Sequence, residues 1–271
     1  MVISVCNNKG GVGKSAVSVN LSNALGNKGK RCLVVDYDPQ GNSSELLLDG
    51  VTPQHTLFDV LEGDIPIKEA VTATSFENLH VLANEGGTAA MEMKLYADVR
   101  SSYPLLRKIL SEIVAYYDFI FLDLPPNLGM FTIQALIASQ AVIVPIDASS
   151  KHSLQGLNAA IKAIQEISKQ FNPDLRFLRA VVNKVDKRTS ISKTITEQVR
   201  RVWNDQVFQT SIPICADIQK AETASTTVIR YAPHSTGAKR FRALADELLD
   251  IIGTEAKIDP TIPMEFNGVE R

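Results

Sequence analysis

The feature that most constrains this 271-residue chain is a glycine-rich segment, residues 8–15, that joins an apolar stretch to a helix-forming stretch. Its sequence is Asn-Lys-Gly-Gly-Val-Gly-Lys-Ser. The glycines let the backbone curl so that successive N–H groups converge on an anion, and the following helix adds the positive end of its dipole. A Gly-Lys-Ser ending in this setting predicts a phosphate-binding loop rather than an ordinary glycine-rich turn.

Apolar and helix-forming stretches alternate along the rest of the chain. We expect strands at residues 2–6, 31–36, 79–83, 119–124, 141–146 and 177–183. Helices are expected at 15–27, 102–116, 131–139, 153–170, 190–203 and 235–252. Because the apolar runs are uninterrupted, the strands should be buried on both faces. The pattern predicts an α/β fold of the P-loop NTPase type, a mostly parallel twisted sheet with helices on both faces.

Composition limits the class of protein further. One domain is expected over residues 1–253, followed by an irregular tail over 254–271 that contains two prolines. Neither an apolar run of 18 residues nor a secretory leader is apparent, so a cytoplasmic protein without a membrane partner is predicted. Three cysteines, at positions 6, 32 and 215, lack C-x-x-C spacing and suggest small buried residues rather than a disulfide or metal site.

The net charge of -2 hides an asymmetry along the chain. Residues 1–150 hold 10 Lys and Arg against 16 Asp and Glu, whereas residues 176–242 hold 13 against 5. A basic segment in an otherwise acidic protein is typical of a localised surface that binds a polyanion.

The chemistry of the glycine-rich loop suggests a role for each of its residues. Lys14 would neutralise the β- and γ-phosphates of ATP or ADP, and Ser15 would give its hydroxyl to Mg²⁺. The remaining nucleotide contacts would come from the loop residues Lys9, Gly10, Gly11, Val12 and Gly13.

Two further segments place carboxylates at strand ends. Asp36 and Asp38 follow one apolar strand, and Asp123 ends another. Parallel strands end at the same edge of a sheet, so these acids should lie near the phosphates and Mg²⁺. The simpler alternative for the first two is an ordinary turn before Pro39 and Gly41.

The loop departs from the usual G-x-x-x-x-G-K-[ST] pattern, because Asn8 replaces the first glycine and Lys9 follows it. Residues 9–15 resemble the K-G-G-x-G-K-[ST] signature of the deviant-loop ATPases of the ParA/MinD superfamily. Residues 36–42, Asp-Tyr-Asp-Pro-Gln-Gly-Asn, are similar to its second signature, and residues 119–126 to its third. The resemblance continues to about residue 250 and favours the ParA branch.

The resemblance implies roles that the residues alone do not. Lys9 would cross a dimer interface to the partner's phosphates, and Asp38 would position the attacking water, so that Lys9, Lys14 and Asp38 are the catalytic candidates. Asp36 and Asp123 would support Mg²⁺ through water. Asn183 and Pro213 fall where adenine contacts are expected. Ser15-Ala16 replaces the usual Thr-Thr, and no helix-turn-helix precedes residue 2, so operator-specific repression is not expected.

By the same resemblance the chain would be a weak ATPase that forms a homodimer on ATP and binds DNA non-specifically on the nucleoid. A ParB-like partner would stimulate hydrolysis, and the cycle would segregate a plasmid, a chromosome or a protein cargo. Cations in the early turns of the last helix oppose its dipole, which favours a DNA-binding role over a solvated surface. The candidate DNA contacts are Arg200, Arg201, Lys220, Arg230, Lys239, Arg240 and Arg242.

Two alternatives stay open at this point. A MinD-like membrane-associated positioning ATPase would need a basic amphipathic C-terminal helix, which residues 254–271 do not resemble. A metabolic or redox enzyme on the same fold is the other. Its iron–sulfur version would need cysteines beyond the third signature, and none lies between residues 33 and 214.

Overall fold

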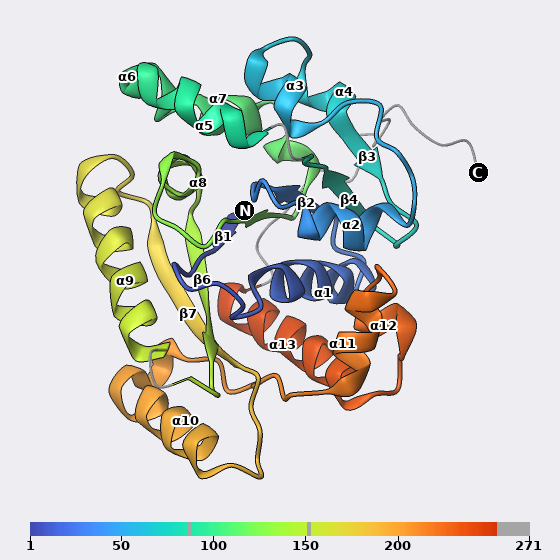
Figure 1. Cartoon of the computed structure of the whole chain (residues 1–271), viewed down its shortest axis with the longest axis vertical. Helices are drawn as coiled ribbons and strands as arrows, with labels where there is room; N and C mark the ends of the chain where they lie inside the picture. The colour runs from blue at the N-terminus through green and yellow to red at the C-terminus, as the bar shows by residue number, and fades with distance from the viewer. Residues whose placement is uncertain (86–87, 151–152, 254–271) are drawn as a thin grey trace.

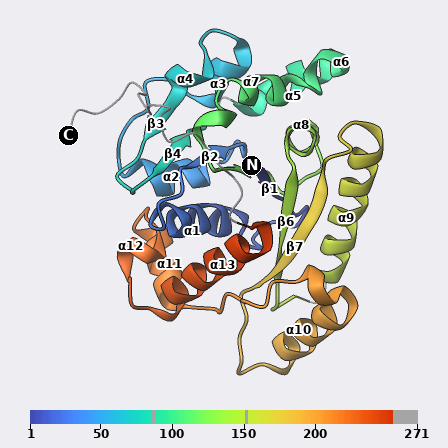
Figure 2. The ribbon, with the colours of Figure 1, turned by 180° about the vertical axis from the view of Figure 1, so that it is seen from behind.

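The protein is built around one twisted sheet, seen in the computed structural model in Figures 1 and 2. The structure describes residues 1–85, 88–150 and 153–253. Seven strands lie in the order β3-β4-β2-β5-β1-β6-β7. Their bounds are β1 Val2–Val5, β2 Cys32–Asp36, β3 Val71–Ala73, β4 Leu79–Leu82, β5 Phe119–Asp123, β6 Ala141–Asp147 and β7 Arg176–Asn183. Within the described ranges only β3 pairs in the antiparallel sense, with β4.

Helices cover both faces of this sheet. The lower right of Figure 1 shows α1 together with α11, α12 and α13. Figure 2, from behind, places α9 along β7 at the other side of the sheet. The longer helices are α1 Lys14–Gly26, α5 Thr88–Ala97, α8 Met130–Ala138, α9 Ser153–Gln170, α10 Ser190–Trp203, α11 Ala216–Thr223 and α13 Thr236–Ile252. The shorter ones are α2 Asn42–Leu48, α3 Leu57–Glu62, α4 Ile67–Ala70, α6 Val99–Ser102, α7 Leu105–Ser111 and α12 Val228–Tyr231, with 3-10 turns η1 Val114–Tyr116 and η2 Asn204–Gln206.

Two hydrophobic layers hold the helices to the sheet, one on each face. In β5 the side chains alternate: Phe119 and Phe121 face the layer that includes α1 and α13, whereas Ile120 and Leu122 face the layer that includes α8 and α9. All four are buried. The absence of polar alternation in the sequence is therefore explained by burial on both faces.

The predicted parallel sheet with helices on both faces is confirmed, and all six predicted strands are present. The expected helix 102–116 is wrong in extent: Pro104 caps a shorter α7, which ends at Ser111. Proline has no N–H to continue a preceding helix, so the segment divides there. Strand β3 and several short helices were missed because single turns show little periodicity. The single domain over residues 1–253 stays a prediction, and the tail 254–271 lies outside the described residues.

Candidate nucleotide-binding site

The glycine-rich loop lies between the end of β1 and the start of α1, near the middle of the sheet. Gly11 and Gly13 adopt left-handed backbone angles, with φ of 72° and 90°. A Cβ atom on Gly13 would lie 2.2 Å from the side-chain nitrogen of Asn183. Glycine is therefore required at position 13 both by conformation and by space.

Lys14 is the first residue of α1 and is 7% exposed. Burial lowers the pKa of its ammonium, while Asp123 and Asp38 act in the opposite direction. The positive charge is thus held beside two carboxylates at the start of a helix, where an anion is also favoured by the helix dipole. This is the arrangement expected of a phosphate-binding lysine.

Asp36 and Asp123 are direct neighbours across β2 and β5, and both are fully buried. Burial first, and then the charge of Asp123, raise the pKa of Asp36 to about 8. Burial likewise raises the pKa of Asp123, although hydrogen bonds from Ser43 and Ser15 oppose the shift. Two buried acids this close favour their ionised forms only when positive charge is near, so the pair fits a divalent cation that oxygen atoms hold.

Serine residues that the sequence reasoning missed complete the acid pair. Ser44 donates to the Asp36 carboxylate from both its N–H and its hydroxyl, each at 2.7 Å. The Ser43 hydroxyl donates to Asp123 at 2.7 Å. Both serines lie in the first turn of α2, directly after the Asp-Pro-Gln-Gly-Asn segment, and this adjacency is the signal that could have identified them.

Asp38 lies next to the acid pair and is 6% exposed. The N–H of Gln40 donates to its carboxylate at 3.0 Å, and the Asn84 side chain donates to its backbone carbonyl at 3.0 Å. These bonds fix the turn that points Asp38 towards the cavity, which it lines. Asn84 follows β4 and was not predicted, because nothing in the sequence connects it to the loop.

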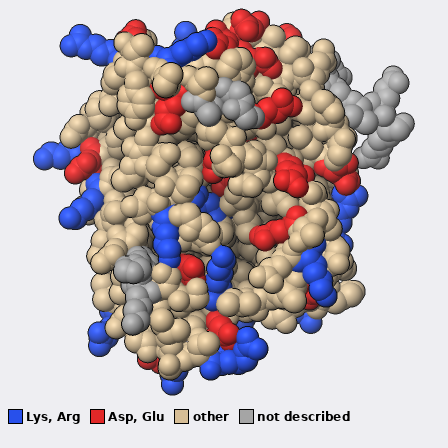
Figure 3. Space-filling model, viewed as in Figure 1, with Lys and Arg blue, Asp and Glu red and all other residues tan. Residues whose placement is uncertain are grey.

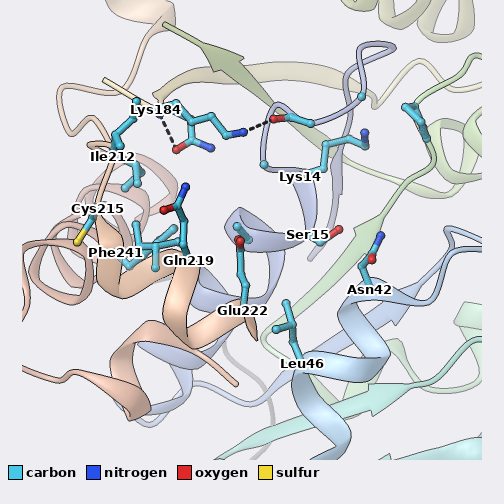
Figure 4. Close-up of a pocket in the computed structure, with 18 of the residues that line it drawn as sticks. Lys14, Ser15, Asn42, Leu46, Lys184, Ile212, Cys215, Gln219, Glu222 and Phe241 are labelled. Carbon is cyan, nitrogen blue, oxygen red and sulfur yellow. Dashed lines mark hydrogen bonds between the residues drawn. The ribbon is translucent and has the colours of Figure 1, made fainter. Parts of the chain in front are cut away.

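A cavity of about 680 Å³ connects the predicted phosphate end with the predicted base end. Figure 4 shows Lys14 and Ser15 on one side and Cys215, Gln219 and Phe241 on the other. Asn183 and Pro213 also line it, so the structure brings both predicted base contacts to the same cavity as the loop. The volume is in the range of small-molecule and cofactor sites.

Two of the predicted loop contacts do not line the cavity of the single chain, and a third candidate residue, Asn183, contacts the loop itself. The side chain of Val12 is buried, and Val12 does not line the cavity of the single chain. Neither does Lys9, whose N–H donates to the Asn7 side chain at 3.0 Å. Asn183 uses its amide nitrogen to donate to the Val12 carbonyl at 2.8 Å. Lys9 is therefore free to contact something outside this chain's own cavity.

The candidate DNA contacts fall into two groups. Three of them are hydrogen-bonded within the chain: Arg200 to Gln209, Arg230 to Asp49 and Ser75, and Arg242 to the Pro233 carbonyl. The other four are exposed and have no polar partner among the described residues; they are Arg201, Lys220, Lys239 and Arg240. Figure 3 shows Lys and Arg side chains along the lower edge of the molecule, with Asp and Glu among them.

A phosphate-binding loop after β1, with acids at the ends of the neighbouring strands β2 and β5, defines a P-loop nucleotide-binding protein. A family model described as "AAA domain" matches residues 1–177. The sporulation initiation inhibitor protein Soj of Bacillus subtilis is 34% identical over 248 residues, which cover 91% of this chain and 97% of that protein. The chromosome partitioning protein ParA of Caulobacter vibrioides is 33% identical over 251 residues, covering 92% of this chain and 93% of that protein.

The similarity extends to solved structures. Cobyrinic acid a,c-diamide synthase from Mycobacterium smegmatis, solved with a bound ATP analogue and magnesium, is 28% identical with a TM-score of 0.79. The match covers 97% of this chain and 99% of that one. The chain belongs to the ParA family of P-loop ATPases.

Proposed function

We propose that this protein is a ParA-type switch: it dimerises on ATP, binds DNA non-specifically and hydrolyses ATP when a ParB-like partner stimulates it. The observation that carries the proposal is the cavity in which Lys14, Ser15 and Asp38 line one end and Asn183 and Pro213 the other. The cycle would segregate a plasmid, a chromosome or a protein cargo, with the protein in the cytoplasm and on the nucleoid when bound to ATP.

The residues at the phosphate end fit Mg²⁺ and a nucleotide. Lys14 would neutralise the β- and γ-phosphates, and the N–H groups around Gly10, Gly11 and Gly13 would bind their oxygens. Ser15 would hold Mg²⁺ directly, and Asp36 and Asp123 would hold it through water. When bound, Mg²⁺ supplies positive charge to the phosphates.

Asp38 is the residue proposed to position the attacking water, since its carboxylate lines the cavity beside Lys14. Lys9 is proposed to act in the partner subunit of the ATP dimer. Its absence from its own cavity supports that role, because a lysine that served its own nucleotide would be expected to line it. The turnover of a lone subunit would then be low, and an activating partner would complete the site.

The DNA-binding surface is proposed to use the exposed cations. Arg201, Lys220, Lys239 and Arg240 lie on α10, α11 and α13 and have no polar partner in the described part of the chain. Dimerisation would present this charge twice to one duplex, so binding would be strengthened by ATP. The chromosome partitioning protein ParA of Caulobacter vibrioides, similar over most of this chain, supports a partition role.

The decisive experiment is binding of a random-sequence duplex, followed by fluorescence anisotropy without nucleotide, with ADP, and with ATP and Mg²⁺. Binding should require ATP and should weaken steeply with salt. Asp38→Ala should retain ATP-dependent binding, whereas Lys14→Ala should lose it. Duplex binding that is independent of nucleotide, or absent at low salt, would contradict the DNA switch.

Vesicle binding and ATP hydrolysis, measured beside duplex binding, separate the alternatives. Of the helices in the described ranges, none is long and apolar enough to span a membrane. The tail that a MinD-like membrane attachment would use lies outside these ranges. ATP-dependent binding to anionic vesicles without binding to DNA would favour the membrane class, and ATP hydrolysis coupled to neither surface would favour a metabolic enzyme.

A further inference from the structure

Two carbonyl groups of the phosphate-binding loop accept hydrogen bonds from side chains outside the loop. The loop can aim its N–H groups at phosphates only if the carbonyls between them point away, and those carbonyls then need partners elsewhere. The Val12 carbonyl accepts from the Asn183 side chain at 2.8 Å. The Gly11 carbonyl accepts from the Nζ atom of Lys184 at 2.6 Å. Two consecutive residues, Asn183 at the end of β7 and Lys184 directly after it, therefore hold two consecutive carbonyls of the loop.

Lys184 reaches the loop from an uncommon backbone conformation. Its φ of 54° lies in the left-handed region, which is unfavourable for a residue with a Cβ atom. The N–H of Lys184 donates to the Asn183 side-chain oxygen at 2.8 Å, and the N–H of Val185 donates to the Ile212 carbonyl at 3.0 Å. These bonds keep the turn in place. A strained residue that is held this firmly beside a ligand cavity is commonly functional.

The left-handed backbone conformation of Lys184 places its side chain between the cavity and the loop. Figure 4 shows the side chain crossing the upper part of the cavity, with its amine bonded to the loop. Lys184 lines the cavity together with Glu222 and Gln219 from α11. Its charge therefore contributes to the potential of the cavity while its hydrogen bond fixes the peptide at Gly11, a residue that glycine flexibility would otherwise leave mobile.

We propose that Lys184 is a positioning residue that holds the phosphate-binding loop in its binding conformation, and so sets the affinity for nucleotide rather than the rate of hydrolysis. The inference rests on the nucleotide site of the proposed function. It assigns to Lys184 a role that differs from that of Lys14. Lys184 contacts a backbone carbonyl of the loop, whereas Lys14 would contact the phosphates.

The test uses the full chain and compares Lys184→Met, which keeps the length of the side chain, with Lys187→Met. Lys187 is exposed, lies three residues away and has no polar partner in the described part of the chain, so it is the matched control. Isothermal titration calorimetry with ADP should show about a tenfold weaker affinity for Lys184→Met and no change for Lys187→Met. Turnover at saturating ATP should change less than about twofold.

A purely structural role would give a different result. If Lys184 served only folding, Lys184→Met would lower the melting temperature without ligand but would leave the ADP affinity of the folded chain unchanged. Lys184→Arg keeps the charge and a donor that can reach the loop. We expect Lys184→Arg to bind ADP within about threefold of the unsubstituted chain. Should Lys184→Met fail to fold, the shorter Lys184→Gln replaces it, with the same expected loss.

Equal ADP affinity in Lys184→Met and the unsubstituted chain would overturn this inference, as would a loss of turnover without a loss of affinity. Failure of the unsubstituted chain to bind ADP or ATP would instead overturn the proposed function.

Discussion

The acid-lined end of the sheet and the basic surface of α10 to α13 are built in contrasting ways. At the sheet end the ionisable side chains are buried, and each is fixed by protein donors: Asp36 by Ser44, and Asp123 by Ser43 and Ser18. On the basic surface, Lys239 and Arg240 are exposed and have no polar partner in the described part of the chain.

The difference shows how charge is used in the two regions. A buried charge interacts strongly with its neighbours because water does not screen it. It is tolerated only where hydrogen bonds or an opposite charge offset the loss of hydration. An exposed charge is screened and contributes as one of several, without a fixed geometry. Single substitutions should therefore have large, specific effects at the sheet end and small, additive effects on the basic surface.

Lys14→Ala tests the buried region most severely. We expect the affinity for ATP to fall by about 100-fold, because the buried cation that is proposed to neutralise the β- and γ-phosphates is lost. Calorimetry with ATP and Mg²⁺ measures the change. Lys9→Ala is the control within the same loop and should bind ATP as a single subunit almost normally, since Lys9 does not line the cavity. An equal loss of affinity in both variants would show that Lys9 and Lys14 serve the nucleotide of the same subunit alike.

The double substitution Lys239→Ala with Arg240→Ala tests the exposed region. The affinity of the ATP form for a random duplex should fall by about tenfold at low salt, and the dependence of binding on salt should become weaker. Arg230→Ala is the comparison, because Arg230 already pairs with Asp49 at 3.0 Å and lies over the ring of Phe76. A larger loss in Arg230→Ala would show that the free cations are not the DNA contacts.

Gly156→Ala tests whether α9, a helix that does not line the cavity, affects the buried site. A Cβ atom on Gly156 would lie 2.9 Å from the side-chain oxygen of Asn7, which accepts a hydrogen bond from the N–H of Lys9. The side-chain nitrogen of Asn7 donates to the Pro145 carbonyl. Displacement of Asn7 should weaken ATP-dependent dimerisation by about fivefold and leave ADP binding unchanged. Sedimentation velocity measures the dimer. The exposed Asn158→Ala on the same helix should behave as the unsubstituted chain.

Asp36→Asn should give the smallest of these effects. It should stabilise the chain, whereas the other substitutions weaken binding. The pKa of Asp36 is raised to about 8 by burial and by Asp123. The folded state therefore binds this proton more tightly than the unfolded state, and stability is lost as the pH rises from about 4 towards 8. Asparagine removes that loss, so the ligand-free variant should be more stable by about 1 kcal/mol at pH 8.

Thermal melts without Mg²⁺ at pH 6 and pH 8 measure this gain, which should be larger at pH 8. Asp205→Asn, at an exposed position, should show no gain. A less stable Asp36→Asn at pH 8 would mean that the hydrogen bonds from Ser44 outweigh the relief of charge repulsion.

Much of the fold was predictable because local signals agreed with the tertiary arrangement. Uninterrupted apolar runs gave the parallel strands, and Thr189 and Ser235 cap α10 and α13 within one residue of the expected starts. The sequence could not give Asn84, since its partners Ser44 and Asp38 lie 40 and 46 residues away and it has no motif of its own. Pro104 delays the start of α7 to Leu105, and the helix ends at Ser111, although the apolar pattern alone extended it from residue 102 to 116.

The sequence by itself determined the loop, the order of strands and helices along the chain, and the acids at the strand ends, because these depend on glycine conformation and on residue periodicity. Only the tertiary structure decided that Asp36 lies beside Asp123, that Asn183 and Lys184 hold the loop, and that Arg230 pairs with Asp49. Those contacts join residues 87, 171, 173 and 181 positions apart, and only the packing of the sheet and its helices brings them together.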